Sequence, residues 1–434
     1  MRPVRDGQPL APAPLRMPAA LREFLREETA GGAVLIATAA VALGWANSPW
    51  QDTYHALWQT VLEVRLGRFG LGGDLRQWVN EGLMALFFLV VGLEIKRELV
   101  EGELRSWRQA ALPVIAAAGG MLVPAATYAA LNARGPGAAG WGVPMATDIA
   151  FALGVLALLG ARVPPVLKLF LLALAIVDDL GSILVVTLFY SDRLRPVALA
   201  VAAGLVLVVL GLRRARIAWS VPYVAAGVGL WLAMHAAGVN AALAGVAMGL
   251  LAPARPYTAP ETLHHQSHAL VQDPGPASLR DMLREARGTV STVERLQHDL
   301  HPLTAFLVVP VFALANAGVT LQAAGLGRAG AGAVLTGVVA GRVVGKPVGI
   351  LLALWLAVRL RLSAPLPGVT MRHLVGVATV AGIGFTVPLF VADLAFPGGL
   401  FEAEVKVGLL AASLVSGVAG ILVLRRCRPV GPPP

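Results

Sequence analysis

The stretch Leu171–Tyr190, LLALAIVDDLGSILVVTLFY, decides the fold that we expect for this chain. It has the length of a helix that crosses a lipid bilayer, about 20 residues, and it is apolar except for the adjacent acids Asp178 and Asp179. A carboxylate near the bilayer centre is costly, so such residues are rare and usually functional. Neighbours on a helix point about 100° apart, so the two acids face different surroundings. One acid facing a water-filled cavity and the other a cationic partner would suit exchange of a cation for protons. Pairing of both acids with buried bases is the purely structural alternative.

The composition predicts a polytopic helical membrane protein rather than a soluble enzyme. Hydrophobic residues make up 57% of the 434 residues and charged residues 14%, with 48 Gly, and the mean hydropathy is +0.72. Such values are typical of chains with many apolar spans. A single cysteine, Cys427, excludes an intramolecular disulfide framework and a thiolate metal cluster.

The positive charge follows the pattern of a membrane protein and does not predict nucleic-acid binding. The net charge is +10, but Lys and Arg gather mostly in alternate short loops, as they do on the cytoplasmic side of bacterial membrane proteins. This asymmetry predicts that both termini are cytoplasmic, which agrees with an even number of spans.

The apolar segments predict an all-α fold with about twelve transmembrane helices. At about 20 residues each, the spans fall at 31–47, 82–99, 111–132, 142–160, 167–190, 195–211, 219–237, 239–253, 301–319, 329–358, 371–396 and 403–424. Between the first two spans, a polar segment with alternating Val64 and Leu66 and a glycine-rich turn predicts a small extramembrane β-hairpin.

These segments divide the chain into regions. Residues 1–30 are expected to form a cytoplasmic tail, 31–110 spans one and two with the hairpin, and 111–190 spans three to five. Then come 191–253 with spans six to eight, a cytoplasmic loop at 254–300, span nine in 301–328, spans ten to twelve in 329–426, and a tail at 427–434.

Two spans carry helix-breaking residues at their centres. The fourth contains Gly142 and Pro144, and the eleventh contains Gly382, Gly384, Thr386 and Pro388. Unwound segments at mid-membrane expose carbonyls that can bind a cation, and they direct the dipoles of half-helices into the midplane. If spans three to five and ten to twelve are equivalent, both breaks lie in the middle helix of a triplet, as an inverted repeat with two crossing discontinuous helices requires. Kinked helices that only pack are the alternative.

Few other ionisable residues lie inside the predicted bilayer. Lys346 is mid-span, and because an unpaired buried ammonium is costly we expect it to pair with Asp178 or Asp179. Asp148, beside the first break, can be neutralised by the positive end of a half-helix. Carboxylates, carbonyls and the Thr147 hydroxyl are oxygen ligands that suit a hard cation, and the absence of a dense carboxylate cage favours a monovalent one.

Several motifs resemble those of bacterial sodium/proton antiporters of the NhaA family. They are GLMALFFLVVGLEIKREL from Gly82, ATDIAFALGVLALLG from Ala146, ALAIVDDLGSI from Ala173, HPLTAFLVVPVFALANAGV from His301, VVGKPVGI from Val343 and GIGFTVPLF from Gly382. The resemblance runs from about Leu21 to Arg426.

The resemblance implies roles for individual residues. Asp179 matches the main cation-binding acid, Asp178 the neighbouring acid associated with Lys346, and Thr147 and Asp148 the crossing of the broken helices. A cytoplasmic funnel with a pH-response cluster is implied for Glu81, Glu94, Arg97, Glu98, His298 and His301. A solvated interfacial charge cluster is the alternative for the acids and bases of this last group.

The resemblance also implies the activity. Na⁺ or Li⁺ would bind at Asp178 and Asp179 and be exported in electrogenic exchange for more than one proton, with no cofactor, across a bacterial inner membrane. The hairpin near residues 62 to 75 would join two protomers into a homodimer. A Na⁺-coupled organic-solute symporter of related fold is the alternative function, and an enzyme is the least expected.

Two residues depart from the family pattern. Gln297 stands where a carboxylate is common, and Asn240, in GVNAALAGV, stands where His is often found. Asp299 is a candidate to replace the lost acid, although it lies on another face of the helix. We therefore expect an altered pH dependence with unchanged exchange chemistry.

Overall fold

The computed structural model describes residues 19–66, 69–102, 104–191, 194–215, 217, 220–255, 290–320, 330–396 and 401–427. The described chain is mostly helical, as predicted. Its N-terminal half contains α1 (Ala19–Ala46), α2 (Gln51–Trp58), β1 (Val61–Leu66), β2 (Phe69–Asp74), α3 (Leu75–Gln77), η1 (Trp78–Leu83), α4 (Met84–Val100), α5 (Trp107–Asn132), η2 (Ala138–Gly142), α6 (Ile149–Leu158), η3 (Gly160–Arg162), α7 (Pro165–Phe189) and α8 (Pro196–Arg214). Its C-terminal half contains α9 (Ser220–Ala237), α10 (Leu243–Leu251), α13 (Thr292–Leu303), η4 (Thr304–Val308), α14 (Val309–Asn316), α15 (Ala331–Ala340), η5 (Gly341–Gly345), α16 (Lys346–Arg359), α17 (Met371–Val380), α18 (Thr386–Ala395) and α19 (Glu402–Arg425).

Seven helices in the described part of the chain are long and apolar enough to cross a membrane. They are Gln109–Asn132, Pro165–Phe189, Pro196–Arg214, Ser220–Ala237, Thr292–Asn316, Ala331–Arg359 and Glu402–Arg425. The bent pair Ala30–Ala46 and Gln51–Trp58, which meet at 114°, would make an eighth. The remaining predicted spans correspond to α4, α10 and the shorter apolar helices beside the two breaks.

Some predicted boundaries are wrong. The first helix begins at Ala19, inside the predicted tail, and α13 begins at Thr292, inside the predicted loop 254–300. Both extensions carry charged residues, which an apolar-span criterion rejects although a helix continues through them. Ser291 supplies the start signal for α13, because its side chain accepts a hydrogen bond from the Glu294 amide. Residues 1–18, 256–289 and 428–434 of the predicted tails and loop lie outside the described residues.

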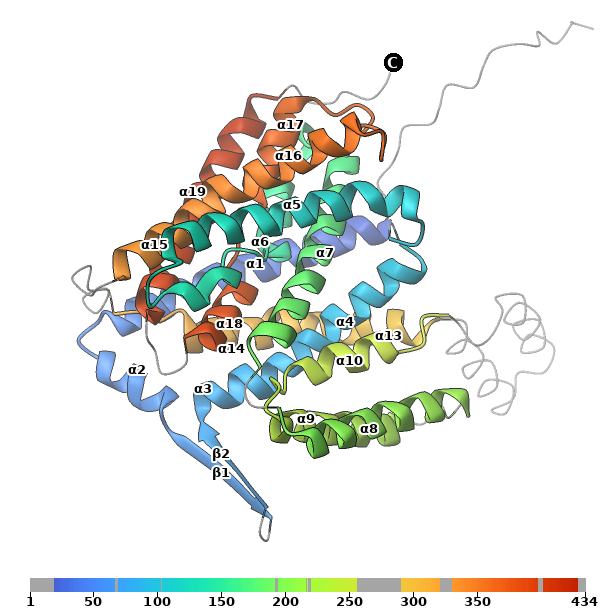
Figure 1. The fold of residues 1–434 in the computed structure, drawn as a ribbon, viewed down its shortest axis with the longest axis vertical. Coiled ribbons are helices and arrows are strands. Elements are labelled where there is room, and N and C mark those ends of the chain that lie inside the picture. Colours follow the sequence, from blue (N-terminus) through green and yellow to red (C-terminus); the bar gives the residue numbers. More distant parts are fainter. Residues whose placement is uncertain are drawn as a thin grey trace, which may run out of the picture.

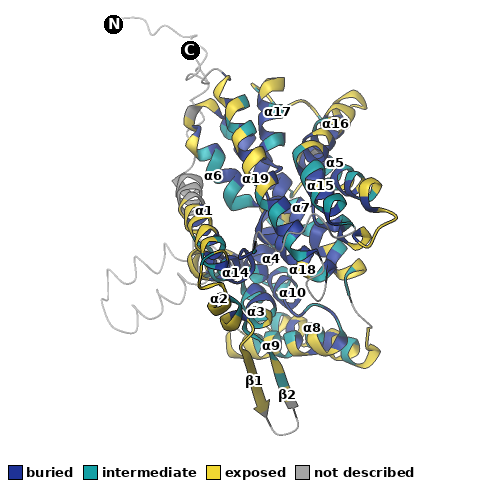
Figure 2. Cartoon of the chain, turned by 90° about the vertical axis from the view of Figure 1, so that its left-hand side faces the viewer, coloured by how far each residue is buried: buried dark blue, intermediate teal, exposed yellow. Residues whose placement is uncertain are grey.

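The long central helix α7 contains the acid pair and is surrounded by the others (Figure 1). Its middle is almost completely buried, whereas α8 and α9 form an outer pair with many exposed apolar side chains, such as Val201 and Val224 (Figure 2). Exposed apolar side chains on long helices are expected where the surroundings are lipid.

The predicted hairpin is confirmed. Strands β1 and β2 pair antiparallel with Val61 opposite Asp74 and Leu66 opposite Phe69, and the hairpin projects from the helical body (Figure 1). The amide of Leu75 donates to the Thr60 carbonyl across 3.0 Å, which closes the base of the hairpin.

Two glycines bring α5 and α16 into close contact. A Cβ atom on Gly119 would collide with the carbonyl oxygen of Gly349, and one on Gly349 would collide with the carbonyl oxygen of Gly119. Small residues permit such backbone contact between membrane helices. The contact is reciprocal, since each glycine meets the backbone of the other.

A candidate cation site between two helix breaks

The two predicted breaks are present and lie against each other. Residues 143–148 separate η2 from α6, and residues 381–385 separate α17 from α18. The Asp148 amide donates a hydrogen bond to the Ile383 carbonyl across 3.0 Å. The fourth predicted span differs from the expectation on one side of its break, where a five-residue 3₁₀ turn stands in place of a half-helix.

One carboxylate caps the helices that follow both breaks. Asp148 Oδ1 accepts from the amide of Phe151 in α6 at 3.2 Å. Asp148 Oδ2 accepts from the amide of Thr386 in α18 at 3.2 Å and from its hydroxyl at 2.9 Å. Both helices therefore direct their positive ends at one buried acid, which is the geometry that the prediction for Asp148 requires.

Asp178 is the acid that pairs with the buried lysine. Its Oδ2 atom lies 2.7 Å from Lys346 Nζ, and both side chains are completely buried. The same oxygen accepts from the Thr147 hydroxyl at 2.7 Å. Lys346 Nζ also donates to the Met145 carbonyl in the first break. The predicted pairing of Lys346 with one of the two aspartates is confirmed.

The acid pair retains two oxygens without a hydrogen-bond partner among the described residues. They are Asp178 Oδ1 and Asp179 Oδ1, both fully shielded from solvent, and Ser182 Oγ one turn further along α7 is in the same condition. A buried carboxylate oxygen without a partner is costly. A bound proton or cation would remove that cost, so these oxygens are where such a ligand fits.

Asp179 lines a cavity together with Thr147 and Asp148 of the first break. The cavity is lined by Gly31, Leu35, Phe87, Val90, Val91, Glu94, Thr147, Asp148, Ile149, Ala150, Asp179, His301, Thr304, Ala305, Val309, Thr386 and Val387. The two acids thus differ as predicted, since Asp179 lines the cavity and Asp178 pairs with the Lys346 ammonium.

Part of the predicted pH-response cluster lies at this cavity. Glu94 and His301 both line it, and Gln297 Nε2 donates to Glu94 Oε1 at 3.4 Å. Glu98 is buried one turn beyond Glu94, with Arg97 Nη2 at 4.0 Å. The structure does not bring His298 to this group, because His298 is exposed, and Asp299 is exposed too. Asp299 therefore does not replace the acid that Gln297 lacks.

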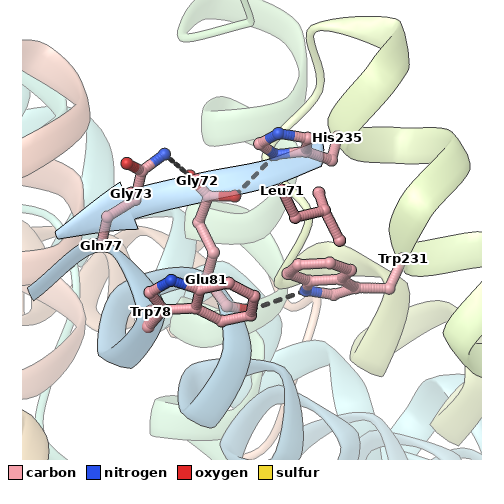
Figure 3. Close-up of a pocket in the computed structure, with 8 residues that line it drawn as sticks. All are labelled: Leu71, Gly72, Gly73, Gln77, Trp78, Glu81, Trp231 and His235. Carbon is pink, nitrogen blue, oxygen red and sulfur yellow. Dashed lines mark hydrogen bonds and ion pairs between the residues drawn. The ribbon is translucent and has the colours of Figure 1, made fainter. Parts of the chain in front are cut away.

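Glu81 lies in a different place from the funnel predicted for it. It lies in η1, between the hairpin and α4. It precedes Glu94 by 13 residues, which is about 20 Å along a helix. Its Oε2 lies 2.8 Å from His235 Nδ1, its Oε1 accepts from Gln77 at 2.8 Å, and its carbonyl accepts from Trp231 (Figure 3). Grouping Glu81 with Glu94 was wrong because the two share a helix but not an end of it.

The other family departure, Asn240, makes a local backbone contact. Its Oδ1 atom accepts from the Ala242 amide at 2.9 Å, immediately before α10 begins. Asn commonly stabilises a turn in this way. Asn240 thus helps to start a helix.

Sequence reasoning gave no role to Arg342, although this side chain reaches both breaks. Its Nε donates to the Gly382 carbonyl at 3.0 Å and its Nη2 to the Ala146 carbonyl at 2.9 Å. A charged residue four positions before Lys346 in an apolar span was a visible signal. What the sequence did not show was that its partners are backbone atoms.

Comparison with known proteins identifies relatives of this chain. The chain is 48% identical over 428 residues to the Na⁺/H⁺ antiporter NhaA 3 of Frankia alni, covering 98% of this chain and 92% of that protein. It is 47% identical to the Na⁺/H⁺ antiporter NhaA of an Anaeromyxobacter species, covering 98% and 96%. In fold, it is similar to the sodium proton antiporter MjNhaP1 of Methanocaldococcus jannaschii, with a TM-score of 0.50, 13% identity and coverage of 94% and 98%.

The family follows from the sequence profile. The profile described as Na⁺/H⁺ antiporter 1 matches residues 22–424, almost the whole chain. The apolar helices of the structure agree with a multi-pass membrane protein. The chain belongs to the NhaA family of Na⁺/H⁺ antiporters.

Proposed function

We propose that this protein exports Na⁺ or Li⁺ in exchange for protons, with Asp178 and Asp179 as the cation-binding acids. The observation that carries this proposal is the pair of buried carboxylate oxygens without hydrogen-bond partners, one on each acid. Monovalent hard cations and protons both compete for such oxygens. The family relationship supports Na⁺ and H⁺.

The charges around the site support a stoichiometry of more than one proton for each cation. In the proton-loaded state Asp179 is neutral, and Asp178 and Lys346 form an ion pair. Cation binding to both acids removes the proton of Asp179 and breaks the ion pair between Asp178 and Lys346. The Lys346 ammonium then loses a proton. Two protons leave as one cation enters, so one net charge moves. A membrane potential then contributes about 2.3 kcal/mol per charge per 100 mV.

The architecture that we propose has twelve spans, built from two inverted repeats with crossing broken helices. Support comes from the reciprocal contact of Gly119 with Gly349 and from the contact of the two breaks at Asp148 and Ile383. Repeats related by an axis in the membrane plane would produce both. The regions 111–190 and 329–426 are then the two repeats, and 31–110 with 191–253 forms the other side of the protein.

The location that we propose is a bacterial inner membrane, with both termini in the cytoplasm. The distribution of Lys and Arg supports this orientation, and the two sequence relatives named above, from Frankia alni and an Anaeromyxobacter species, are bacterial. A homodimer joined by the hairpin is proposed from its exposed position.

The pH dependence of transport is proposed to differ from that of relatives with a carboxylate at position 297. Gln297 donates a hydrogen bond to Glu94, where a carboxylate would share or compete for a proton. The cluster at the cavity therefore contains one titrating group fewer.

The test uses everted membrane vesicles with an acid interior and a pH-sensitive dye. Na⁺ and Li⁺ are expected to collapse the pH gradient of the wild type, whereas K⁺ is not, and Asp179→Asn is expected to abolish the response. Clamping the membrane potential at different values should change the initial rate, because charge moves. A pH gradient unaffected by Na⁺ and Li⁺ between pH 6 and pH 9 would refute the exchange and favour a Na⁺-coupled solute symporter.

A further inference from the structure

Arg342 is completely buried at the centre of the protein, and transport as described above does not use it. It lies in η5, a wide turn of π-helix between α15 and α16, four residues before Lys346. A charged side chain inside a membrane protein is costly unless it is compensated. Its contacts identify what compensates it.

The guanidinium group binds one backbone carbonyl from each helix break. In an unbroken helix the carbonyls of Ala146 and Gly382 would accept from amides four residues further on. The breaks leave both carbonyls free, and Arg342 donates to them from two different nitrogens, at 2.9 Å and 3.0 Å. A planar group with donors on separate nitrogens can serve two acceptors at once, which an ammonium does less well.

The second break is shaped around this side chain. A Cβ atom at Gly384 would collide with Nη2 of Arg342. The Ala146 carbonyl that Arg342 Nη2 binds lies two residues before Asp148 in the same break. Arg342 is therefore in contact with both breaks.

We propose that Arg342 is a positioning residue, a permanent cation of the site that holds the two breaks together beside Asp148. This inference rests on the proposed cation exchange and adds a fixed charge to it. Three acids and two bases then have separate tasks. Arg342 holds the two breaks together, Lys346 pairs with Asp178, and Asp179 makes no ion pair among the described residues. The break carbonyls of Ala146 and Gly382 are already occupied, so a transported cation relies on the carboxylates.

The experiment measures the KM for Na⁺ and the maximal rate of Arg342→Leu and Arg342→Lys in proteoliposomes. We expect Arg342→Leu to raise the KM at least about tenfold, since two charge-assisted hydrogen bonds are lost. Arg342→Lys, which keeps the charge but lacks donors on separate nitrogens, should recover part of the affinity. The control is Arg359→Leu, which removes an exposed arginine at the end of α16 that lies over Trp355, and its KM should remain that of the wild type.

A wild-type KM in Arg342→Leu, or no recovery in Arg342→Lys, would overturn the proposal. If Arg342→Leu does not fold, Gly384→Ala decides. Its added methyl would collide with Arg342 Nη2 and with the Ala146 carbonyl oxygen, so it should impair Na⁺ binding. Combining it with Arg342→Lys relieves the first of these collisions and should restore part of that binding. Strictly additive losses in this pair would also overturn the proposal. Asp179→Asn, assayed in parallel, separates the two hypotheses, since its activity tests cation exchange itself.

Discussion

Thr147 has one hydroxyl hydrogen and two acceptors within reach. Its Oγ1 lies 2.7 Å from Asp178 Oδ2 and 3.0 Å from the Ala381 carbonyl in the second break. A hydroxyl donates one hydrogen bond at a time, so the hydrogen stabilises the carboxylate or the break. The charged acceptor wins while Asp178 is ionised, because hydrogen bonds to charged groups are stronger.

Replacing Thr147 by Val removes this donor while keeping the shape of the side chain. A hydrogen bond to a charged group contributes about 1.5–3 kcal/mol, so we expect the KM for Na⁺ to rise by at least about tenfold in Thr147→Val, with Thr147→Ser close to the wild type. Transport assays in proteoliposomes provide the measurement. Thr187→Val is the control, since that hydroxyl donates only within its own helix, to Ile183. Equal effects of the two valine substitutions would contradict a specific role for Thr147.

Restoring an acid at position 297 tests the altered pH dependence. In Gln297→Glu two carboxylates would face each other where Gln297 now donates to Glu94. Like charges so close favour retention of a proton to higher pH, so the activity profile should shift to more alkaline pH and become steeper. Activity measured from pH 6 to pH 9 shows the shift. The exposed Gln109→Glu substitution on α5 should leave the profile unchanged, and a profile unchanged in Gln297→Glu would show that Gln297 does not set it.

Single residues show how far the sequence was informative at this scale. The pairing of Lys346 with an aspartate could be predicted because a buried ammonium needs an acid, and few acids lie in the spans. The contacts of Arg342 could not be predicted, because every residue has a backbone carbonyl and the sequence does not distinguish the ones that accept from it. The position of Glu81 was predicted wrongly for a related reason. The motif places Glu81 and Glu94 on one helical segment but does not show which other helices each end of that segment contacts.

At the scale of elements, two wide π-helical turns precede prolines and carry or adjoin site residues. Pro310 follows η4 and Pro347 follows η5. Proline has no amide hydrogen, and its ring collides with the carbonyl four residues earlier, which here belongs to Phe306 or Val343. The Lys346 amide bonds instead to Gly341, five residues back. Such turns are frequently found at functional sites.

Pro347→Ala is expected to make the protein more stable and less active. The alanine supplies an amide and removes the ring collision, so η5 can tighten to a regular α-helix. This would turn Arg342 relative to Lys346, and we expect the melting temperature to rise while the exchange rate falls severalfold. Thermal unfolding and transport assays measure the two effects. Pro196→Ala, in the first turn of α8, should change neither, because proline is tolerated there. An unchanged exchange rate in Pro347→Ala would show that the wide turn η5 does not affect transport.

The type of each element was easier to predict from the sequence than the residues at which it begins and ends. Glycine and proline in spans four and eleven correctly indicated breaks, because these residues cannot continue a helix without loss. The beginnings of α1 and α13 were missed, since polar residues such as Glu294 extend a helix beyond any apolar span. The 3₁₀ turn of η2 was also unexpected, although Gly137, Gly140 and Gly142 in and beside it weaken a regular helix.

On the scale of the whole molecule, the hairpin and the exposed apolar helices form the outer surface. Val61, Val64 and neighbouring apolar side chains of the hairpin are exposed in the single chain. Exposed strands are available for pairing with another copy. The hairpin is closed at its base by the bond from Leu75 to Thr60, so it can be shortened without separating the flanking segments.

Replacing residues 61–73 by Gly-Gly-Ser is therefore expected to convert a dimer into a monomer that still exchanges cations. Asp74 is kept because its carboxylate caps α3 through the Gln77 amide. Light scattering of the protein in detergent measures the mass, and vesicle assays measure exchange. Glu63→Ala is the control, since its ion pair with Arg65 is exposed and contributes little. A shortened protein that remains dimeric would show that other surfaces hold the protomers together.

The shared cap at Asp148 has a consequence for movement. Because one carboxylate holds the first turns of α6 and α18, and the Asp148 amide holds Ile383, neither half-helix can slide along its axis without pulling the other. The two broken helices therefore move as one rigid unit. In the proposed exchange, opening the acids to the opposite side of the membrane would displace that unit as a whole. The unit would then move past α1, which packs beside α6, and past α14, which packs beside α18.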